Sequence, residues 1–122
     1  MDAAQRAEID SDVAVAVDFF SGMQGNKAQV RIEEMGKKAI PALLSTFKGQ
    51  TWESREEQYA AFKVQQMLRT IVKAEQPPSD LVARFMGREL GDPKVFKRAA
   101  RMWIAWWLGH LRHQESFKEF EE

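Results

Sequence analysis

Hydrophobic residues recur at steps of three and four along most of the chain, in helix-length segments separated by glycine and proline. About six such segments follow one another, and the connections between them are short. Helices joined by short connections pack as antiparallel neighbours. The pattern therefore predicts an all-α protein in which each helix lies beside the next one along the chain.

The clearest helix is predicted to follow Ser54. Ser54 and Glu57 fit the S-x-x-E capping box, in which the two side chains satisfy free backbone N–H groups at a helix start. From there to Lys73, the apolar residues share one side of the helix. They are Ala60, Ala61, Val64, Met67, Leu68, Ile71 and Val72.

The last two helices are marked by breaks in the chain. Two prolines at 77 and 78 stop the fourth helix, and Ser79 or Asp80 is predicted to cap a fifth. Residues 91–93, Gly-Asp-Pro, then supply a terminating glycine, a capping aspartate and a first-turn proline in succession. A sixth helix is expected to run from there to roughly residue 113.

The first three helices are predicted at residues 10–22, 26–35 and 38–48. Alternating alanine and valine in the first segment are also typical of a strand, but every residue from 13 to 17 is apolar, which leaves no polar face for a half-buried strand. Helix is therefore favoured there. Asn26 is expected to cap the second helix and Gly36 to end it, while Pro41 falls near the start of the third.

These helices form three predicted antiparallel pairs, at about residues 10–36, 38–74 and 79–113, within a single domain over residues 1–122. The first helices of the pairs start near residues 11, 38 and 79, so the repeat is irregular. This spacing fits a six-helix globular bundle as well as a small α-solenoid.

Two motifs favour the solenoid. Residues 36–44, GKKAIPALL, resemble the G-x-x-A-x-P-x-L-L opening of a first helix in HEAT repeats. Residues 92–100, DPKVFKRAA, resemble the D-P-x-V-R-x-x-A-A start of a second helix, with Arg98 displaced by two positions. The resemblance to the HEAT and armadillo-like families implies a right-handed stack of helix pairs with a concave surface, and a role as a scaffold that binds other macromolecules. The globular bundle is the alternative.

Composition narrows the class of protein. Basic and acidic residues number 18 each, so no overall field steers the chain to nucleic acid or to an anionic membrane. The chain has no cysteine, which excludes disulfides and thiolate metal sites. The start of the sequence does not have the form of a signal peptide, and no stretch approaches the roughly 18 apolar residues of a membrane span. We expect a cytoplasmic protein without a cofactor.

The fourth helix carries the first candidate partner-binding residues. Tyr59, Lys63 and Gln66 lie opposite its apolar side and would face the concave surface of a solenoid. Aromatic residues dominate binding hot spots, so Tyr59 is the expected anchor. The competing explanation is an ordinary solvated face with Tyr59 packed against a neighbouring helix pair.

The sixth helix carries the remaining candidates. Residues 102–108 are apolar all round and include Trp106, so this segment is covered by Phe117 and Phe120, by a second copy of the chain, or by a partner. Burial by the C-terminal residues or by the core is favoured. Lys94, Lys97, Arg98 and Arg101 form a basic stripe on the first half of this helix, with Arg84 and Arg88 nearby in sequence.

Chemistry-bearing motifs are scarce. His110 and His113 are one helical turn apart, but two ligands do not make a metal site, and no catalytic motif is present. We therefore expect a non-enzymatic module that binds a protein or peptide on a concave helical face. The alternatives are a nucleic-acid binder that uses the basic stripe, and an accessory domain that acts on a small molecule or modifies a protein.

Overall fold

A computed structural model describes residues 2–73 and 91–109 of the chain. All regular structure among these residues is helical, which confirms the all-α class. The elements are α1 (Ala3–Ala16), α2 (Met23–Met35), the 3₁₀ helix η1 (Gly36–Ala39), α3 (Ile40–Ser45), α4 (Arg55–Val72) and α5 (Pro93–Gly109). The predicted fifth helix and the end of the predicted sixth lie outside the described residues.

Helix α1 differs from its prediction at both ends. It begins at Ala3 rather than near Asp10, because the Asp2 carboxylate accepts a 2.7 Å hydrogen bond from the Gln5 N–H and caps the first turn. It also ends at Ala16, and residues 17–22 form a turn in which the Asp18 side chain accepts from the Phe20 N–H. Helix rather than strand is confirmed for the Ala-Val segment up to Ala16.

Helix α2 packs directly against α1, and Gly25 is the reason the two backbones come close. A Cβ atom at Gly25 would lie 2.1 Å from the Ser21 Oγ and 3.3 Å from the Val15 carbonyl oxygen. The helix begins at Met23, three residues before the expected cap Asn26, and Gly22 at the cap position supplies no side-chain bond. Its predicted end at Gly36 is confirmed.

The third helix is shorter than predicted. Residues 36–39 form the tighter η1, and α3 covers only six residues, with Pro41 in its first turn as expected. The backbone N–H groups of Thr46, Phe47 and Lys48 each bond to the carbonyl three residues back, so the chain tightens into turns there and the α-helix does not extend to Lys48.

The starts of α4 and α5 agree with their predicted caps. The Ser54 Oγ accepts from the Glu57 N–H at 3.1 Å, and the Asp92 carboxylate accepts from the Lys94 N–H at 3.0 Å. The Glu57 carboxylate does not close the capping box on the Ser54 backbone, and instead accepts from the Thr51 N–H and hydroxyl. Burial raises the pKa of Glu57, but these hydrogen bonds outweigh it and the net pKa is lowered.

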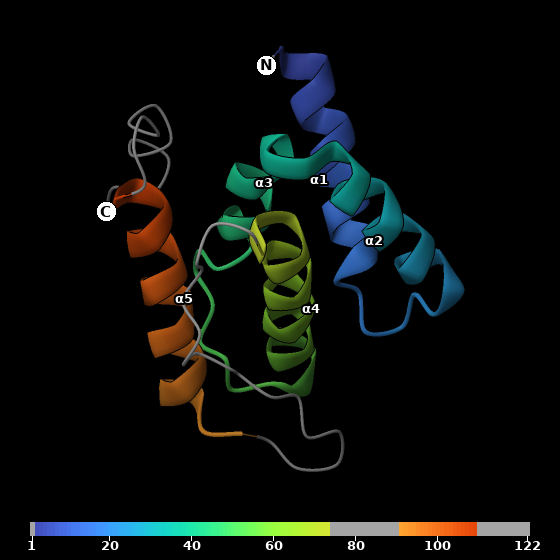
Figure 1. Ribbon diagram of the computed structural model, residues 1–122. Helices are drawn as coiled ribbons and strands as arrows, with labels where there is room; N and C mark the ends of the chain where they lie inside the picture. The colour runs from blue at the N-terminus through green and yellow to red at the C-terminus, as the bar shows by residue number, and fades with distance from the viewer. Residues whose placement is uncertain (1, 74–90, 110–122) are drawn as a thin grey trace.

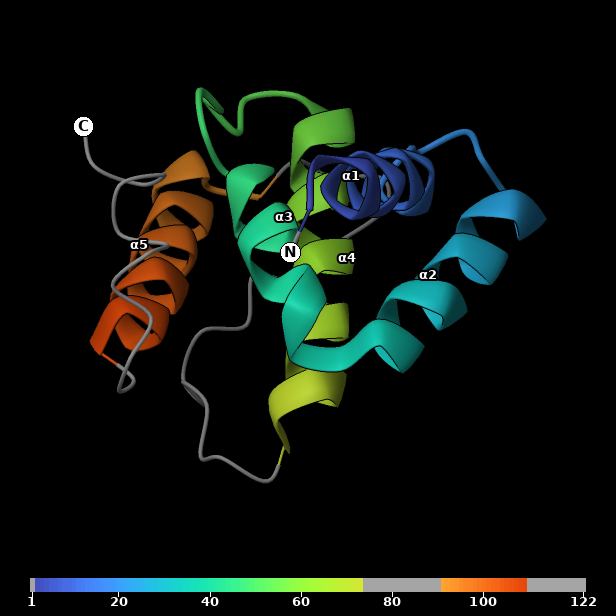
Figure 2. The ribbon, with the colours of Figure 1, turned by 90° about the horizontal axis from the view of Figure 1, so that it is seen from above.

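Helices α3 and α4 occupy the middle of the molecule (Figures 1 and 2). Helix α3 contacts α1, α4 and α5, and α4 contacts α2, α3 and α5, so α5 and the α1–α2 hairpin lie on opposite sides of this centre. One continuous core joins all five α-helices. Its largest fully buried side chains are Trp103, Phe96, Ile32, Ile40, Leu43, Leu44, Met67 and Leu68.

Candidate interaction surfaces

The candidate residues of α4 do not form one open face. Tyr59 is half-buried, and its ring packs edge-on against Phe19 in the α1–α2 connection, with ring centres 5.2 Å apart. Gln66 is exposed, and Lys63 is only 7% exposed. The placement of Lys63 on a solvated face is therefore wrong.

Lys63 is buried because α4 has neighbours on more than one side. Its ammonium group donates to the Gln29 side chain of α2, and Gln29 in turn donates to the Glu33 carboxylate at 3.3 Å. Lys63 makes no ion pair with any residue in the described ranges. Burial lowers the pKa of Lys63, and the negative charge of Glu33 opposes this only in part.

We expect Lys63→Met to raise the free energy of unfolding by about 1 kcal/mol at pH 7, since a well-packed apolar side chain avoids burying a charge. The pKa of Lys63 is lower in the folded protein than its unfolded value of 10.5, so the unfolded chain binds more protons in the alkaline range below 10.5. The free energy of unfolding of the wild type therefore rises with pH in this range, and the difference in stability between Lys63→Met and the wild type becomes smaller.

Urea denaturation of the wild type and Lys63→Met at neutral and alkaline pH measures this difference. Lys73→Met is the matched control, because Lys73 is exposed at the end of the same helix and the change should leave stability nearly unaltered at each pH. A stability difference between Lys63→Met and wild type that stays constant with pH would contradict the assignment.

The tryptophans of α5 divide by exposure. Trp103 and Trp107 are buried in the core, whereas Trp106 is half-buried and packs edge-on against Trp103 at a ring separation of 5.9 Å. Core burial thus accounts for two of the three tryptophans in the apolar segment of this helix. Phe117 and Phe120, which the sequence offered as a cover, lie outside the described residues.

A buried glutamine that the sequence analysis missed connects α4 to the start of α5. Gln58 is 1% exposed. Its Nε2 donates to the carbonyl oxygens of Trp52 and Gly91 at 2.8 and 2.9 Å, and its Oε1 accepts from the Gly91 N–H at 2.8 Å. All three contacts are near ideal length. This Gln58 clamp fixes the backbone directly before Pro93 and so positions α5.

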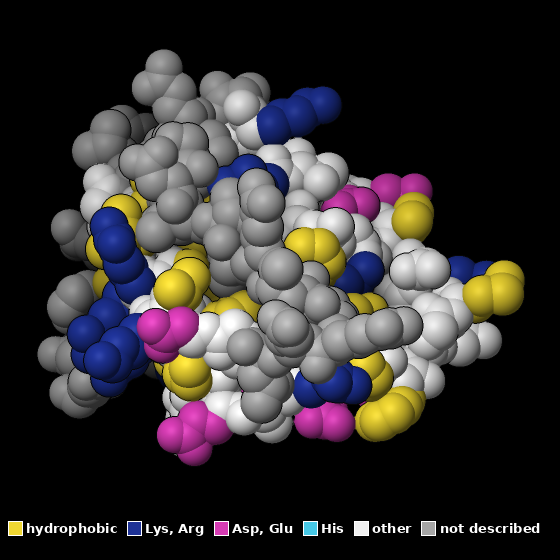
Figure 3. Space-filling model, turned by 90° about the horizontal axis from the view of Figure 1, so that it is seen from below, with side chains coloured by type: hydrophobic (Ala, Val, Ile, Leu, Met, Phe, Trp, Pro, Cys, Tyr) yellow, Lys and Arg dark blue, Asp and Glu magenta, His cyan; other side chains and the backbone are white. Residues whose placement is uncertain are grey.

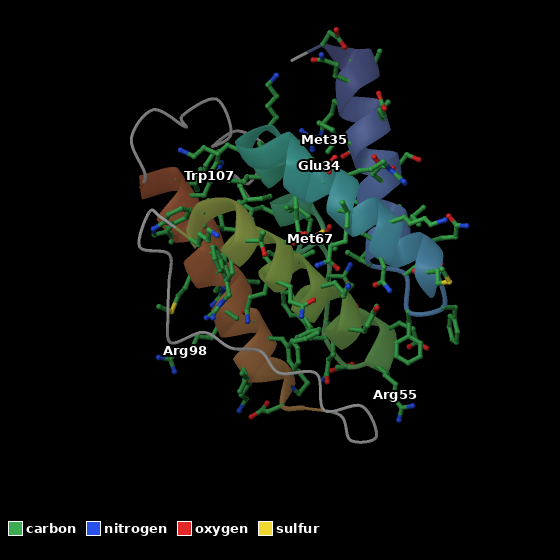
Figure 4. The ribbon with its side chains drawn as sticks, turned by 45° about the vertical axis from the view of Figure 1, so that its right-hand side comes forward. Glu34, Met35, Arg55, Met67, Arg98 and Trp107 are labelled. Atoms are coloured by element: carbon green, nitrogen blue, oxygen red, sulfur yellow. The ribbon has the colours of Figure 1, made fainter. Side chains whose placement is uncertain are left out.

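The exposed side of α5 carries four cations, Lys94, Lys97, Arg98 and Arg101, which we call the cationic face. They recur at three- and four-residue steps, and Phe96, Ala99, Ala100, Trp103 and Trp107 fill the opposite, buried side. With Met102, the four cations line a hollow of about 410 Å³. Lysine and arginine side chains gather on the side of the molecule where α5 lies (Figure 3), and Arg98 extends outward from the helix (Figure 4).

The cationic face lacks compensating charge. None of its four side chains makes an ion pair or a side-chain hydrogen bond with a residue between 2 and 73 or between 91 and 109. The first turn of α5 contains no acidic residue, whereas α4 has Glu56 and Glu57 in that position. A cation in the first turn of a helix opposes the helix dipole, so Lys94 does not stabilise α5 through that dipole.

Two further surface features escaped the sequence analysis. Phe20 is 78% exposed at the α1–α2 turn, and Met23 and Val30 are exposed seven residues apart on one side of α2. A second hollow, of about 340 Å³, lies where α1 meets the end of α2 and η1 (Figure 4 labels Glu34 and Met35). It is lined by Gln5, Glu8, Ile9, Glu34, Met35 and Lys38, which carry charges of both signs.

Within the described part of the chain, no group of three or more His, Asp or Glu residues is placed to bind a metal ion, and no helix is long and apolar enough to cross a membrane. His110 and His113 lie outside it, as do Arg84 and Arg88. The chain matches no protein-family model, no curated protein and no solved structure. The HEAT-like resemblance therefore stays a prediction from the two motifs.

Proposed function

We propose that the protein is a non-enzymatic interaction module that binds an acidic segment of a partner protein on the cationic face of α5. The proposal retains a small HEAT-like solenoid as its architecture. Two placements support it: the 36–44 motif falls at the junction of η1 and α3, and the 92–100 motif starts α5. The binding surface moves from α4 to α5, because Lys63 is buried.

The observation that carries the proposal is the set of four exposed, uncompensated cations around an apolar hollow. Isolated surface charges contribute little to stability, and Lys94, in the first turn, opposes the dipole of its own helix. A partner segment with carboxylates would be attracted to all four at once, and Met102, 40% exposed beside them, offers contact to an apolar side chain. This combination of contacts matches an acidic segment that also carries apolar residues.

A nucleic acid is the less favoured ligand for this face. Binding of single strands combines cations with aromatic rings on which bases stack. No aromatic side chain lines the hollow among the described residues, and Trp106 is engaged with Trp103. The chain as a whole also has no net positive charge. Phosphate contacts alone would give weak binding with a steep dependence on salt.

The test is fluorescence anisotropy with a labelled peptide of repeated Glu-Glu-Phe units, and separately with a labelled duplex DNA. We expect the peptide to bind and Arg98→Glu/Arg101→Glu to weaken its affinity by about tenfold or more, since each reversal turns attraction into repulsion. Lys27→Glu/Lys73→Glu is the matched control, with the same change of net charge at exposed positions outside α5.

An equal loss of peptide affinity in both double variants would show that only the net charge of the protein matters. That result would overturn the assignment of the binding site to α5. Tighter binding of DNA than of the peptide, abolished by the α5 variant, would replace the proposal with nucleic-acid binding. Absence of peptide binding at low salt, where surface electrostatics are strongest, would also overturn it.

A further inference from the structure

Residues 115–122 of the chain have the acidic and apolar composition proposed for a ligand of the cationic face. Their sequence, ESFKEFEE, contains four glutamates, one lysine and two phenylalanines, which gives a net charge of −3 (one positive minus four negative). The cationic face carries four positive charges and an exposed methionine. The two are complementary in charge and in apolar content.

The chain is long enough to bring the two together. The structure describes α5 as far as Gly109, and residues 110–122 follow it in the chain. Thirteen extended residues span roughly 45 Å. Arg101 lies eight residues before Gly109, or about 12 Å back along the helix, and Lys94 lies about 22 Å back. The extended length of residues 110–122 therefore exceeds the distance to every cation of the cationic face.

We infer that residues 115–122 bind the cationic face of their own chain and compete there with the acidic partner segment. This inference rests on the proposed function for its regulatory meaning, but its geometry is tested separately. The glutamates approach the four cations, and Phe117 and Phe120 provide apolar contact with Met102 and with Val95, the other large hydrophobic residue exposed on the helix. A partner then gains access only by displacing this segment.

The short connection makes even a weak contact effective. A segment tethered by a few residues has an effective concentration of about 1 mM. With an intrinsic dissociation constant of about 0.1 mM, the face is then occupied roughly nine-tenths of the time. An external peptide would bind about tenfold more weakly than to the free face, because only the unoccupied fraction is competent. Substitutions in residues 115–122 that weaken the intramolecular contact should therefore raise the affinity for an external peptide by about tenfold.

The test uses the full-length chain with a nitroxide at Ser116→Cys, which is a unique attachment site because the chain has no cysteine. We expect the nitroxide to broaden the backbone amide signals of residues 94–102 and to leave those of α1 sharp. Glu119→Gln/Glu121→Gln/Glu122→Gln in the same labelled chain should remove the broadening, and in the unlabelled chain should raise affinity for the Glu-Glu-Phe peptide about tenfold.

Sharp signals for residues 94–102 in the nitroxide-labelled chain would overturn the inference, even if the external peptide binds and the proposed function stands. Broadening without any binding of the external peptide would support the intramolecular contact and overturn the proposed function instead. A mixture of ¹⁵N-labelled chain without nitroxide and nitroxide-bearing chain without ¹⁵N reports only contacts between two copies. Broadening of residues 94–102 in that mixture as strong as in the chain that carries both labels would identify a second copy as the occupant and overturn the intramolecular contact.

Discussion

Replacing Trp103 with alanine should lower the free energy of unfolding by about 4 kcal/mol, within the range for removal of a large buried aromatic side chain. Trp103 is 1% exposed and is the largest fully buried side chain among those described. Its loss removes packing between α5 and the core. Its indole N–H has no hydrogen-bond partner among the described residues, so the cost comes from volume and not from polarity.

Trp106→Ala provides the matched control for this prediction. Trp106 is on the same helix but half-buried, so its truncation should cost about 1 kcal/mol. Urea denaturation followed by circular dichroism measures both variants without relying on tryptophan fluorescence. Similar losses for the two variants would contradict the observed division between a buried and a half-exposed tryptophan.

Gln58→Leu should cost about 3 kcal/mol, although leucine is close to glutamine in size and more apolar. The change removes three hydrogen bonds and leaves the Gly91 N–H and the carbonyls of Gly91 and Trp52 without the amide that satisfies them. Trp52 also has a positive φ of 56°, which is unfavourable for a bulky residue, so its backbone depends on such support.

Gln66→Leu makes the same chemical change at an exposed position of α4 and should alter stability by no more than about 0.5 kcal/mol. Thermal and urea denaturation compare the two variants. If Gln58→Leu were as stable as Gln66→Leu, the Gln58 clamp would contribute nothing net to folding, and the position of α5 would have to depend on its apolar contacts alone.

The helices that the sequence predicts well are those with local start signals. Ser54 and the Asp92–Pro93 pair determine the beginnings of α4 and α5 through their own side chains and rings. The beginning of α1 was missed because, among residues 3–9, only Ile9 is buried, and no apolar repeat marks the first two turns. The short α3 was missed because hydrophobic spacing does not separate α-helical turns from the tighter turns that flank them.

The candidate site was predictable where it depends on one helix and not where it depends on several. The cationic stripe follows from the spacing of α5 alone, and its exposure agrees with that spacing. The burial of Lys63 depends on α2. This helix packs against a side of α4 that the spacing of polar residues in α4 predicts to be exposed. Likewise, nothing near Gln58 in sequence indicates its partner Gly91, which is 33 residues away.

The Gln58 clamp also governs how the protein opens. The amide proton of Gly91 is bonded to a side chain of α4, so it can exchange with solvent only when the connection between the two helices breaks. Separation of α5 from α4 should therefore expose the Gly91 N–H, and deuterium uptake at Gly91 should keep pace with uptake in the middle of α5. A ligand on the outer surface of α5 would slow both together, which extends its effect into the centre of the molecule.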